Sequence, residues 1–163
     1  MTTPWSRQEP NTDIVVRPIS VGDRCAIWDW RNDPVKGVAI PVISRADYSQ
    51  HKEWYRRTVD NKRVFFSVGL VETLRIGCVR FDLEVTGVFG VRFFLKPVYC
   101  GRGIGSQFLK KSVALLQEHR SVKRVVAIAR HVSPSTIAVY TGAGFEVIED
   151  DRILQFEFHC GTL

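Results

Sequence analysis

The chain has 163 residues, of which 45% are hydrophobic and 25% are charged, and its formal charge is +6. This composition excludes a disordered chain, a collagen-like chain and a coiled-coil rod. The length favours one domain with its own core. The excess of Lys and Arg suits an anionic partner. Because the basic residues form no run of five or more, we expect no nucleic-acid partner.

The sequence contains four cysteines, Cys25, Cys78, Cys100 and Cys160. They lie far apart and form no CxxC motif, so we expect neither a metal site nor disulfides. The first twelve residues are polar, and no segment reaches the roughly 18 apolar residues of a membrane span. We therefore expect a flexible tail over residues 1–12, one domain over residues 13–163, no membrane contact and a cytoplasmic location.

After the expected tail, the first predicted element is a short strand over residues 13–19. Ser20 is a suitable N-cap for a helix that runs to about Trp30. This helix should end before Pro34, because proline disfavours helical backbone in the residue that precedes it. Residues 35–43 are apolar and irregular, and we interpret them as a loop packed over a site.

A second helix is expected over residues 45–60, with Ser44 and Asp47 as a capping pair. Its apolar spacing places Tyr48, His51 and Tyr55 on one stripe, with Trp54 beside it. We interpret this stripe as the core-facing side of an amphipathic helix. The wall of an acceptor pocket is the alternative.

The rest of the chain predicts six strands and two helices. We expect strands over residues 64–71, 75–84, 88–96, 124–129, 145–149 and 153–159, and helices over residues 104–119 and 133–142. The strand over residues 124–129 has an apolar core bounded by basic residues and should be central and buried on both faces. The element order is β-α-α-β-β-β-α-β-α-β-β, an α/β architecture of the mixed α+β type with a central mixed sheet.

A glycine-rich turn carries the clearest chemical signal. Gly101, Gly103 and Gly105 follow a strand and open a helix, so their backbone N–H groups and the helix dipole make an anion site. The spacing fits neither the dinucleotide fingerprint nor the P-loop of nucleoside triphosphatases. We predict that the turn binds a phosphate or pyrophosphate.

The segment from Leu95 to Ser106 resembles motif A of the GCN5-related N-acetyltransferases, the pattern [Gln/Arg]-x-x-Gly-x-[Gly/Ala] after a strand and a Pro-containing bend. Gly103 and Gly105 match this pattern. Cys100 stands where Gln or Arg is usual, and Arg102 can supply the missing charge.

A second segment, Ser133 to Phe145, resembles motif B of the same family, Asn-x-x-[Ala/Ser]-Ile-x-x-Tyr-x-x-x-Gly-Phe. Ile137, Tyr140 and Gly144 match in register, as does Phe145. Ser133 replaces the Asn, and Thr136 replaces the small residue. The two motifs occur in the family's order and separation, with an apolar strand between them, and the resemblance covers the chain from about residue 14 to its end.

The resemblance implies the family's fold, with the sheet splayed at the cofactor site, and acetyl-coenzyme A (acetyl-CoA) as the donor. The residues that it implies for cofactor binding are Phe93, Phe94, Leu95, Cys100, Gly101, Arg102, Gly103, Ile104, Gly105, Ser106, Ser133 and Tyr140. An amine would attack the thioester directly in a ternary complex. Tyr140 is a plausible acid for the leaving thiolate, and a backbone N–H such as that of Leu95 can polarise the carbonyl.

The general base is less well defined by the sequence. Asp82 and Glu84 lie on one face of their strand and are the preferred candidates. His51, His119 and His131 are weaker candidates. A chain of water molecules leading to bulk solvent is a further alternative.

The acceptor is expected to be a small-molecule primary amine. The segment Trp30-Arg31-Asn32-Asp33-Pro34 resembles a subgroup that acetylates amino groups of nucleotide-linked sugars, including enzymes of the pseudaminic-acid pathway. A related pattern occurs in acetyltransferases of ribosomal proteins and aminoglycosides. We assign Trp30, Arg31 and Asn32 to acceptor binding, since indole rings stack on sugars or bases and arginine pairs with phosphate. A buried, capped helix end is the simpler alternative.

Two other functions remain open at this point. The departures at Cys100 and Ser133 are compatible with a domain that binds CoA without catalysis. The basic surface is compatible with a module that binds nucleic acid or protein. A homodimer is possible, because the family often dimerises.

Overall fold

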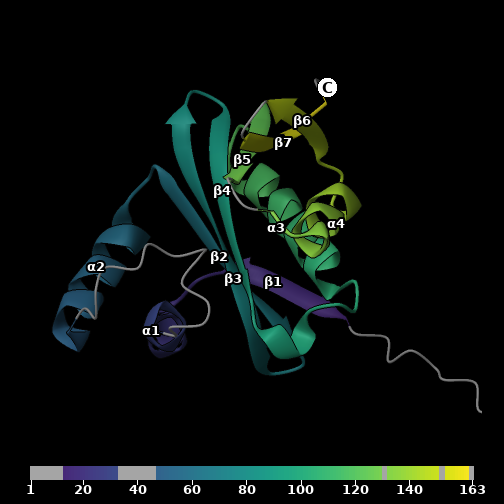
Figure 1. Cartoon of the computed structure of the whole chain (residues 1–163). Coiled ribbons are helices and arrows are strands. Elements are labelled where there is room, and N and C mark those ends of the chain that lie inside the picture. The colour runs from purple at the N-terminus through teal and green to yellow at the C-terminus, as the bar shows by residue number, and fades with distance from the viewer. Residues whose placement is uncertain (1–12, 33–46, 130–131, 151–152, 162–163) are drawn as a thin grey trace, which may run out of the picture.

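The computed structural model describes residues 13–32, 47–129, 132–150 and 153–161 (Figure 1). Its strands are β1 (Ile14–Pro18), β2 (Val64–Val71), β3 (Leu74–Val85), β4 (Val88–Leu95), β5 (Arg124–Ala129), β6 (Glu146–Asp150) and β7 (Ile153–His159). Its helices are α1 (Arg24–Asn32), α2 (Tyr48–Asp60), α3 (Ile104–His119) and α4 (Pro134–Gly142), with short 3-10 turns η1 (Val21–Asp23) and η2 (Pro97–Tyr99). The expected element order is confirmed.

Some expectations concern residues that the structure does not describe. The predicted tail over residues 1–12, the loop over residues 35–43, Ser44 and His131 all lie outside the described residues. Helix α2 begins at Tyr48 rather than at residue 45. Its N-cap is Asp47, whose side chain accepts a hydrogen bond from the Ser49 N–H.

The seven strands form one mixed sheet in the order β1-β2-β3-β4-β5-β7-β6. Every neighbouring pair is antiparallel except β4 and β5, which are parallel and are joined through α3. Figure 1 shows α1 and α2 on one face of this sheet and α3 and α4 on the other. Each face therefore has its own layer of helices.

Strands β4 and β5 pair over a short length only. Their registered pairs are Val88 with Arg124, Phe89 with Val125, and Gly90 with Val126. Past Gly90, β4 continues to Leu95 without a partner on this side, although it stays paired with β3 along its whole length. The sheet is therefore splayed between β4 and β5, as the family resemblance implied.

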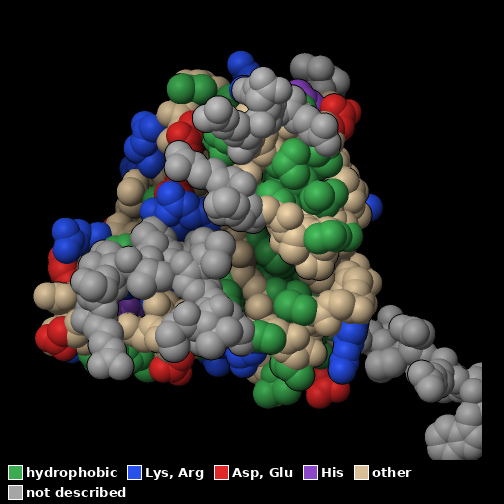
Figure 2. All heavy atoms as spheres, in the orientation of Figure 1, with side chains coloured by type: hydrophobic (Ala, Val, Ile, Leu, Met, Phe, Trp, Pro, Cys, Tyr) green, Lys and Arg blue, Asp and Glu red, His purple; other side chains and the backbone are tan. Residues whose placement is uncertain are grey.

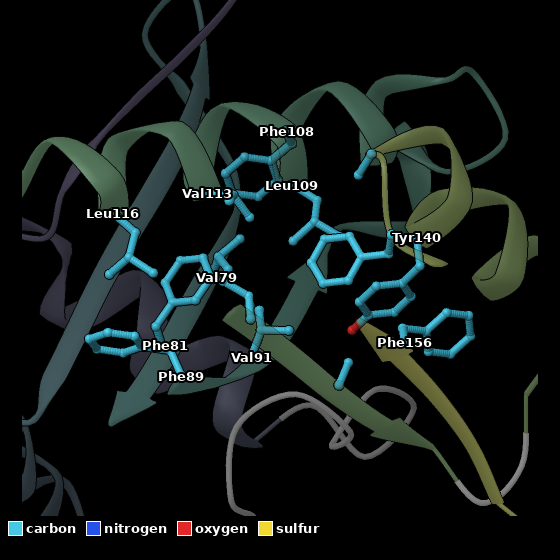
Figure 3. Close-up of a cluster of buried hydrophobic side chains, with 14 of the residues drawn as sticks. Val79, Phe81, Phe89, Val91, Phe108, Leu109, Val113, Leu116, Tyr140 and Phe156 are labelled. Carbon is cyan, nitrogen blue, oxygen red and sulfur yellow. The ribbon is translucent and has the colours of Figure 1, made fainter. Parts of the chain in front are cut away.

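Helix α3 lies very close to the sheet. A Cβ atom at Gly69 would lie 2.5 Å from the Phe108 ring, and one at Gly77 would overlap the Phe94 carbonyl oxygen. Phe108 is fully buried against these two glycines. Figure 3 shows the continuation of this core, in which Leu109 and Val113 on α3 face the side chains of β3 and β4. The glycines thus set the position of the helix that follows the phosphate-binding turn.

The prediction that residues 124–129 are buried on both faces was wrong. Val125 and Ala127 are buried, but the Ile128 side chain is 66% exposed. The apolar pattern is real, but because β4 diverges from β5, the second face of β5 borders open space rather than core.

A buried ion pair joins the N-terminal segment to the sheet. The Asp23 carboxylate is fully buried and accepts hydrogen bonds from Arg17, from Arg75 at 2.7 Å and from the Ser20 N–H at 2.7 Å. The last contact confirms that Ser20 begins this helical segment. Burial alone would raise the pKa of Asp23, but the hydrogen bonds from the two arginines and Ser20 outweigh it and hold the pKa well below its ordinary value.

We predict that Asp23→Asn lowers the free energy of unfolding by about 3 kcal/mol, because it leaves two arginines without a buried counter-charge. The folded-state pKa of Asp23 is depressed, so its contribution is complete above the unfolded-state pKa of about 3.9 and is lost as the pH falls below that value. Urea unfolding between pH 3 and pH 7 measures both effects. Asp60→Asn, at an exposed pair with Arg56, is the matched control. Equal stability of the two variants at pH 7 would contradict this role for Asp23.

Candidate active site

A cleft of about 670 Å³ opens where β4 and β5 separate. Figure 2 shows hydrophobic side chains at the surface near the centre of the view, over this part of the sheet. The lining comes from β4, the glycine turn, β5 and α4: Val91, Arg92, Phe93, Phe94, Leu95, Cys100, Gly101, Gly103, Gly105, Ser106, Ala127, Ile128, Ala129, Ser135, Thr136, Ala138, Val139 and Tyr140. Two segments that resemble family motifs thus meet at one cleft.

The β4 wall offers backbone hydrogen-bonding groups. The Lys96 N–H donates to the Ile76 carbonyl on the β3 side at 2.8 Å. Because backbone groups alternate in direction along a strand, the N–H groups of Leu95 and Phe93 face the cleft. A ligand with amides of its own can pair with them in place of the missing strand. This arrangement agrees with the expected positions of Phe93 and Leu95.

The glycine turn has the conformation that the sequence predicted. Gly101 and Gly103 have φ values of +78° and +72°, which residues with a Cβ atom rarely adopt. Gly103 is the N-cap of α3 and has no side chain to bond the first N–H groups of the helix. By contrast, the Ser133 hydroxyl accepts a hydrogen bond from the Thr136 N–H at the start of α4. The N-terminus of α3 is therefore left free to bind an anion.

Gly105 differs from Gly101 and Gly103 because it is needed for the contact between two helices. It does not have a positive φ, and a Cβ atom there would lie 3.0 Å from Val139 on α4. A Cβ atom at Gly142 on α4 would lie 2.5 Å from the Ser106 hydroxyl oxygen. These two glycines let the first turn of α3 pack directly against α4. Gly105 also lines the cleft, so its predicted part in the anion site stays a prediction beside this packing role.

Tyr140 lies on the cleft wall contributed by α4. Its ring stacks on Phe156 at 4.5 Å between centroids (Figure 3). It also meets the Phe145 ring edge-on at 5.2 Å. Burial raises the pKa of Tyr140 to about 12. The phenol is therefore uncharged at neutral pH and keeps its proton available for donation.

Asp82 and Glu84 lie on the α1–α2 face of β3 and do not line the cleft. Both oxygens of Asp82 accept hydrogen bonds from Arg80, at distances of 2.7–3.0 Å. Glu84 sits at a β-bulge, where its carboxylate lies over Gly90, the last residue of β4 that pairs with β5. Asp82 lies directly opposite Gly90 in the register, so both candidate bases lie near the point where the strands part.

His51 is fully buried and both of its ring nitrogens are occupied. Arg31 Nη1 lies 2.9 Å from His51 Nδ1, and His51 Nε2 lies 2.9 Å from the Arg24 carbonyl oxygen. Arginine has no acceptor, so Nδ1 accepts and Nε2 carries the proton. Burial, with the charges of Arg31 and Arg24, lowers the pKa of His51. This neutral, fully bonded ring is not placed to act as a base. His119, the other candidate within the structure, is bonded to the Leu115 carbonyl.

Several predicted site residues have structural roles instead. Trp30 is buried and packs on Phe94 with ring centroids 5.2 Å apart, so its ring is not open to a ligand. Asn32 donates to the Trp28 carbonyl, which closes the end of α1. Arg102, Ile104 and Ser133 do not line the cleft: Arg102 is exposed, Ile104 belongs to the core and Ser133 caps α4.

Ile128, Thr136 and Val139 also line the cleft, although the sequence predicted no cofactor-binding role for them. Ile128 lies in an apolar run that looks the same for a buried strand and for a cleft wall, so its pattern alone does not reveal this position. Arg92 was also missed, since its position depends on the register between β3 and β4.

Two further observations concern the same described residues. No three His, Cys, Asp or Glu side chains gather there in a way that would hold a metal ion. None of the described helices combines the length and the apolar character needed to cross a membrane.

The fold and the cleft are those of an acyltransferase. The family described as "Acetyltransferase (GNAT) domain" matches residues 13–146. The chain therefore belongs to the GNAT family of acetyltransferases.

Solved structures share this fold at low sequence identity. Spermidine N-acetyltransferase from Vibrio cholerae, in complex with CoA and spermine, has a TM-score of 0.73 at 13% identity over 91% of this chain and 96% of that chain. An aminoglycoside acetyltransferase in complex with ribostamycin and coenzyme A has a TM-score of 0.73 at 18% identity, over 90% and 93%. Campylobacter jejuni N-acetyltransferase PseH has a TM-score of 0.67 at 13% identity, over 91% and 99%.

We predict that Gly103→Ala weakens CoA binding. A side chain at a φ of +72° costs about 1 kcal/mol, so the turn relaxes, and restoring it on binding raises the dissociation constant about fivefold. Isothermal titration calorimetry with CoA measures this change. Gly161→Ala is the matched control, since Gly161 has open space around it and no positive φ. An unchanged affinity in Gly103→Ala would show that the turn does not contact the ligand.

Proposed function

We propose that this acetyltransferase moves the acetyl group of acetyl-CoA to the primary amine of a small molecule, by direct attack in a ternary complex. One observation carries the proposal. The cleft between the parted strands has the uncapped N-terminus of α3 at one end and the buried phenol of Tyr140 on its wall. An anionic, amide-containing thioester has matching groups along its whole length.

The chain's own groups define how the donor would lie. The N–H groups at the first turn of α3, opened by Gly101 and Gly103, suit the pyrophosphate. The amides of the pantetheine arm suit the cleft-facing backbone of Phe93 and Leu95. The exposed apolar side chain of Ile128 offers the arm a surface on the β5 side. Cys100, in place of the usual Gln or Arg, lines this end of the cleft.

The reaction needs three things of the protein. The amine must reach the thioester uncharged, so that its lone pair forms the new C–N bond. A backbone N–H such as that of Leu95 stabilises the negative charge that develops on the carbonyl oxygen. As the C–S bond breaks, the leaving thiolate takes the proton of the Tyr140 phenol.

The removal of a proton from the amine is assigned to a carboxylate on the α1–α2 face. Glu84 suits this role better than Asp82, because Asp82 is held on both oxygens by Arg80. The side chain of Glu84 is exposed and lies beside the opening between the strands. A bridging water can complete the path from amine to carboxylate.

A nucleotide-linked amino sugar is our first candidate for the acceptor. It is supported by the resemblance of the segment Trp30-Arg31-Asn32-Asp33-Pro34 to enzymes that acetylate such sugars. The buried guanidinium of Arg31, on the α1–α2 face of the sheet, also supports it. A ribosomal-protein N-terminus or an aminoglycoside is the alternative. The non-enzymatic alternatives are a domain that binds CoA without catalysis and a basic module that binds nucleic acid or protein. The homodimer and the cytoplasmic location stay predictions.

We expect acetyl-CoA to raise the melting temperature of the protein by several degrees. At a concentration of about 100 times the dissociation constant, binding adds about 2.7 kcal/mol to the free energy of unfolding. Differential scanning fluorimetry with acetyl-CoA, and with NADH and ATP as controls, measures the effect. No shift at saturating acetyl-CoA would refute the donor assignment. It would also favour the nucleic-acid or protein-binding alternative.

We predict that Tyr140→Phe lowers kcat about 100-fold or more, the usual contribution of a general acid, and leaves CoA affinity unchanged. The phenylalanine ring preserves the packing on Phe156 and Phe145. Because the pKa of Tyr140 is about 12, the wild-type rate should show no loss from its ionisation between pH 6 and pH 9. Steady-state kinetics against a panel of amines tests both points. A variant with wild-type kcat would remove Tyr140 from the mechanism.

A further inference from the structure

Two arginines lie side by side on the α1–α2 face of the sheet. Arg80 on β3 and Arg92 on β4 are directly opposite in the antiparallel register, so their side chains leave the sheet on the same face. Like charges directly opposite one another destabilise a strand pair. Among the described residues, this repulsion is relieved at Arg80 alone, because Asp82 pairs with it.

A third arginine approaches the same place from helix α1. The Arg31 guanidinium carbon lies 3.9 Å from the centre of the Trp54 ring, and that of Arg80 lies 5.9 Å from the same ring. Arg31 is only 5% exposed. Burial, and after it the nearby charge of Arg80, lower the pKa of Arg31.

The positive charge at this arginine cluster (Arg31, Arg80 and Arg92) is only partly balanced. Asp82 pairs with Arg80 at 2.7 Å. Within the part of the chain that the structure describes, no carboxylate lies within ion-pair distance of Arg31 or Arg92, and the buried Nε of Arg31 has no hydrogen-bond partner. The described partner of Arg31 is the neutral His51 ring. An unpaired buried donor on a charged group is costly unless a ligand satisfies it.

The arginine cluster also borders the cleft, because Arg92 belongs to the cleft lining. The donor would lie along β4. Arg92 therefore lies both at the cleft that would hold the donor and on the α1–α2 face, from which we expect the acceptor to approach. We propose that the acceptor amine carries a phosphoryl group and that the arginine cluster binds it. Two guanidinium groups without a carboxylate match the double negative charge of a phosphate, and their planar forks suit its oxygens. The proposal rests on the proposed function and narrows its acceptor.

The test uses the protein saturated with CoA, so that the glycine turn is filled and added anions report on other sites. Isothermal titration calorimetry with inorganic pyrophosphate should show one binding site per chain. Arg92→Gln, at an exposed position, should weaken this binding about tenfold or more, since a hydrogen bond to a charged group is lost. Arg31→Lys should act in the same direction, because it keeps the charge and loses the fork. Arg56→Gln, on the outer side of α2, should leave binding unchanged.

The outcomes separate this proposal from the one on which it rests. If CoA does not bind to the protein in the saturation step, the proposed function is contradicted. CoA binding followed by no pyrophosphate binding, or by equal binding to wild type and Arg92→Gln, would overturn the phosphoryl assignment alone. Acetylation kinetics add a second readout: glucosamine 6-phosphate should have a lower KM than glucosamine, and Arg92→Gln should remove this difference. A preference for glucosaminic acid over glucosamine 6-phosphate would identify a carboxylate in place of phosphate.

Discussion

The separation of β4 from β5 in the middle of the sheet is the constraint on which the rest of the molecule depends. Each strand is held on its other side: β3 pairs with β4 as far as Leu95, and β7 pairs with β5 as far as Ala129. The two walls of the gap are therefore fixed by hydrogen bonds that do not involve a ligand. Backbone groups that would be paired in an ordinary sheet face the cleft in fixed positions, so binding does not have to order them.

The two faces of the sheet divide the chemistry. On the side of α3 and α4 the structure presents backbone N–H groups, small residues and a neutral phenol, which suit a long ligand with an anionic end. On the side of α1 and α2 it presents guanidinium groups, carboxylates and the closed packing of His51, Trp54 and Tyr55. A donor and an acceptor that approach from opposite faces can meet at the opening between the strands, and neither has to leave for the other to enter.

Local chemistry made much of this fold predictable. Alternating apolar residues located the strands, and capping residues located the helices, because both signals are read within a few neighbouring positions. The glycine turn was recognisable because positive φ values need glycine. The exposed face of β5 was not predictable, since the apolar residues around Ile128 are the same for a buried strand and for a cleft wall. The arginine cluster was also hidden, because the strand register, rather than spacing along the chain, places Arg80 opposite Arg92.

The close packing of α3 on α4 through Gly105 and Gly142 has a mechanical consequence. The Val139 side chain packs directly on Gly105 and the Ser106 side chain directly on Gly142, which leaves the two helices little room to move independently. A movement of the first turn of α3 therefore moves α4 and carries the phenol of Tyr140 with it. If the turn binds phosphate and Tyr140 is the acid, as we propose, binding energy from the phosphate end of the ligand would fix the distance between the phenol and the bond that breaks.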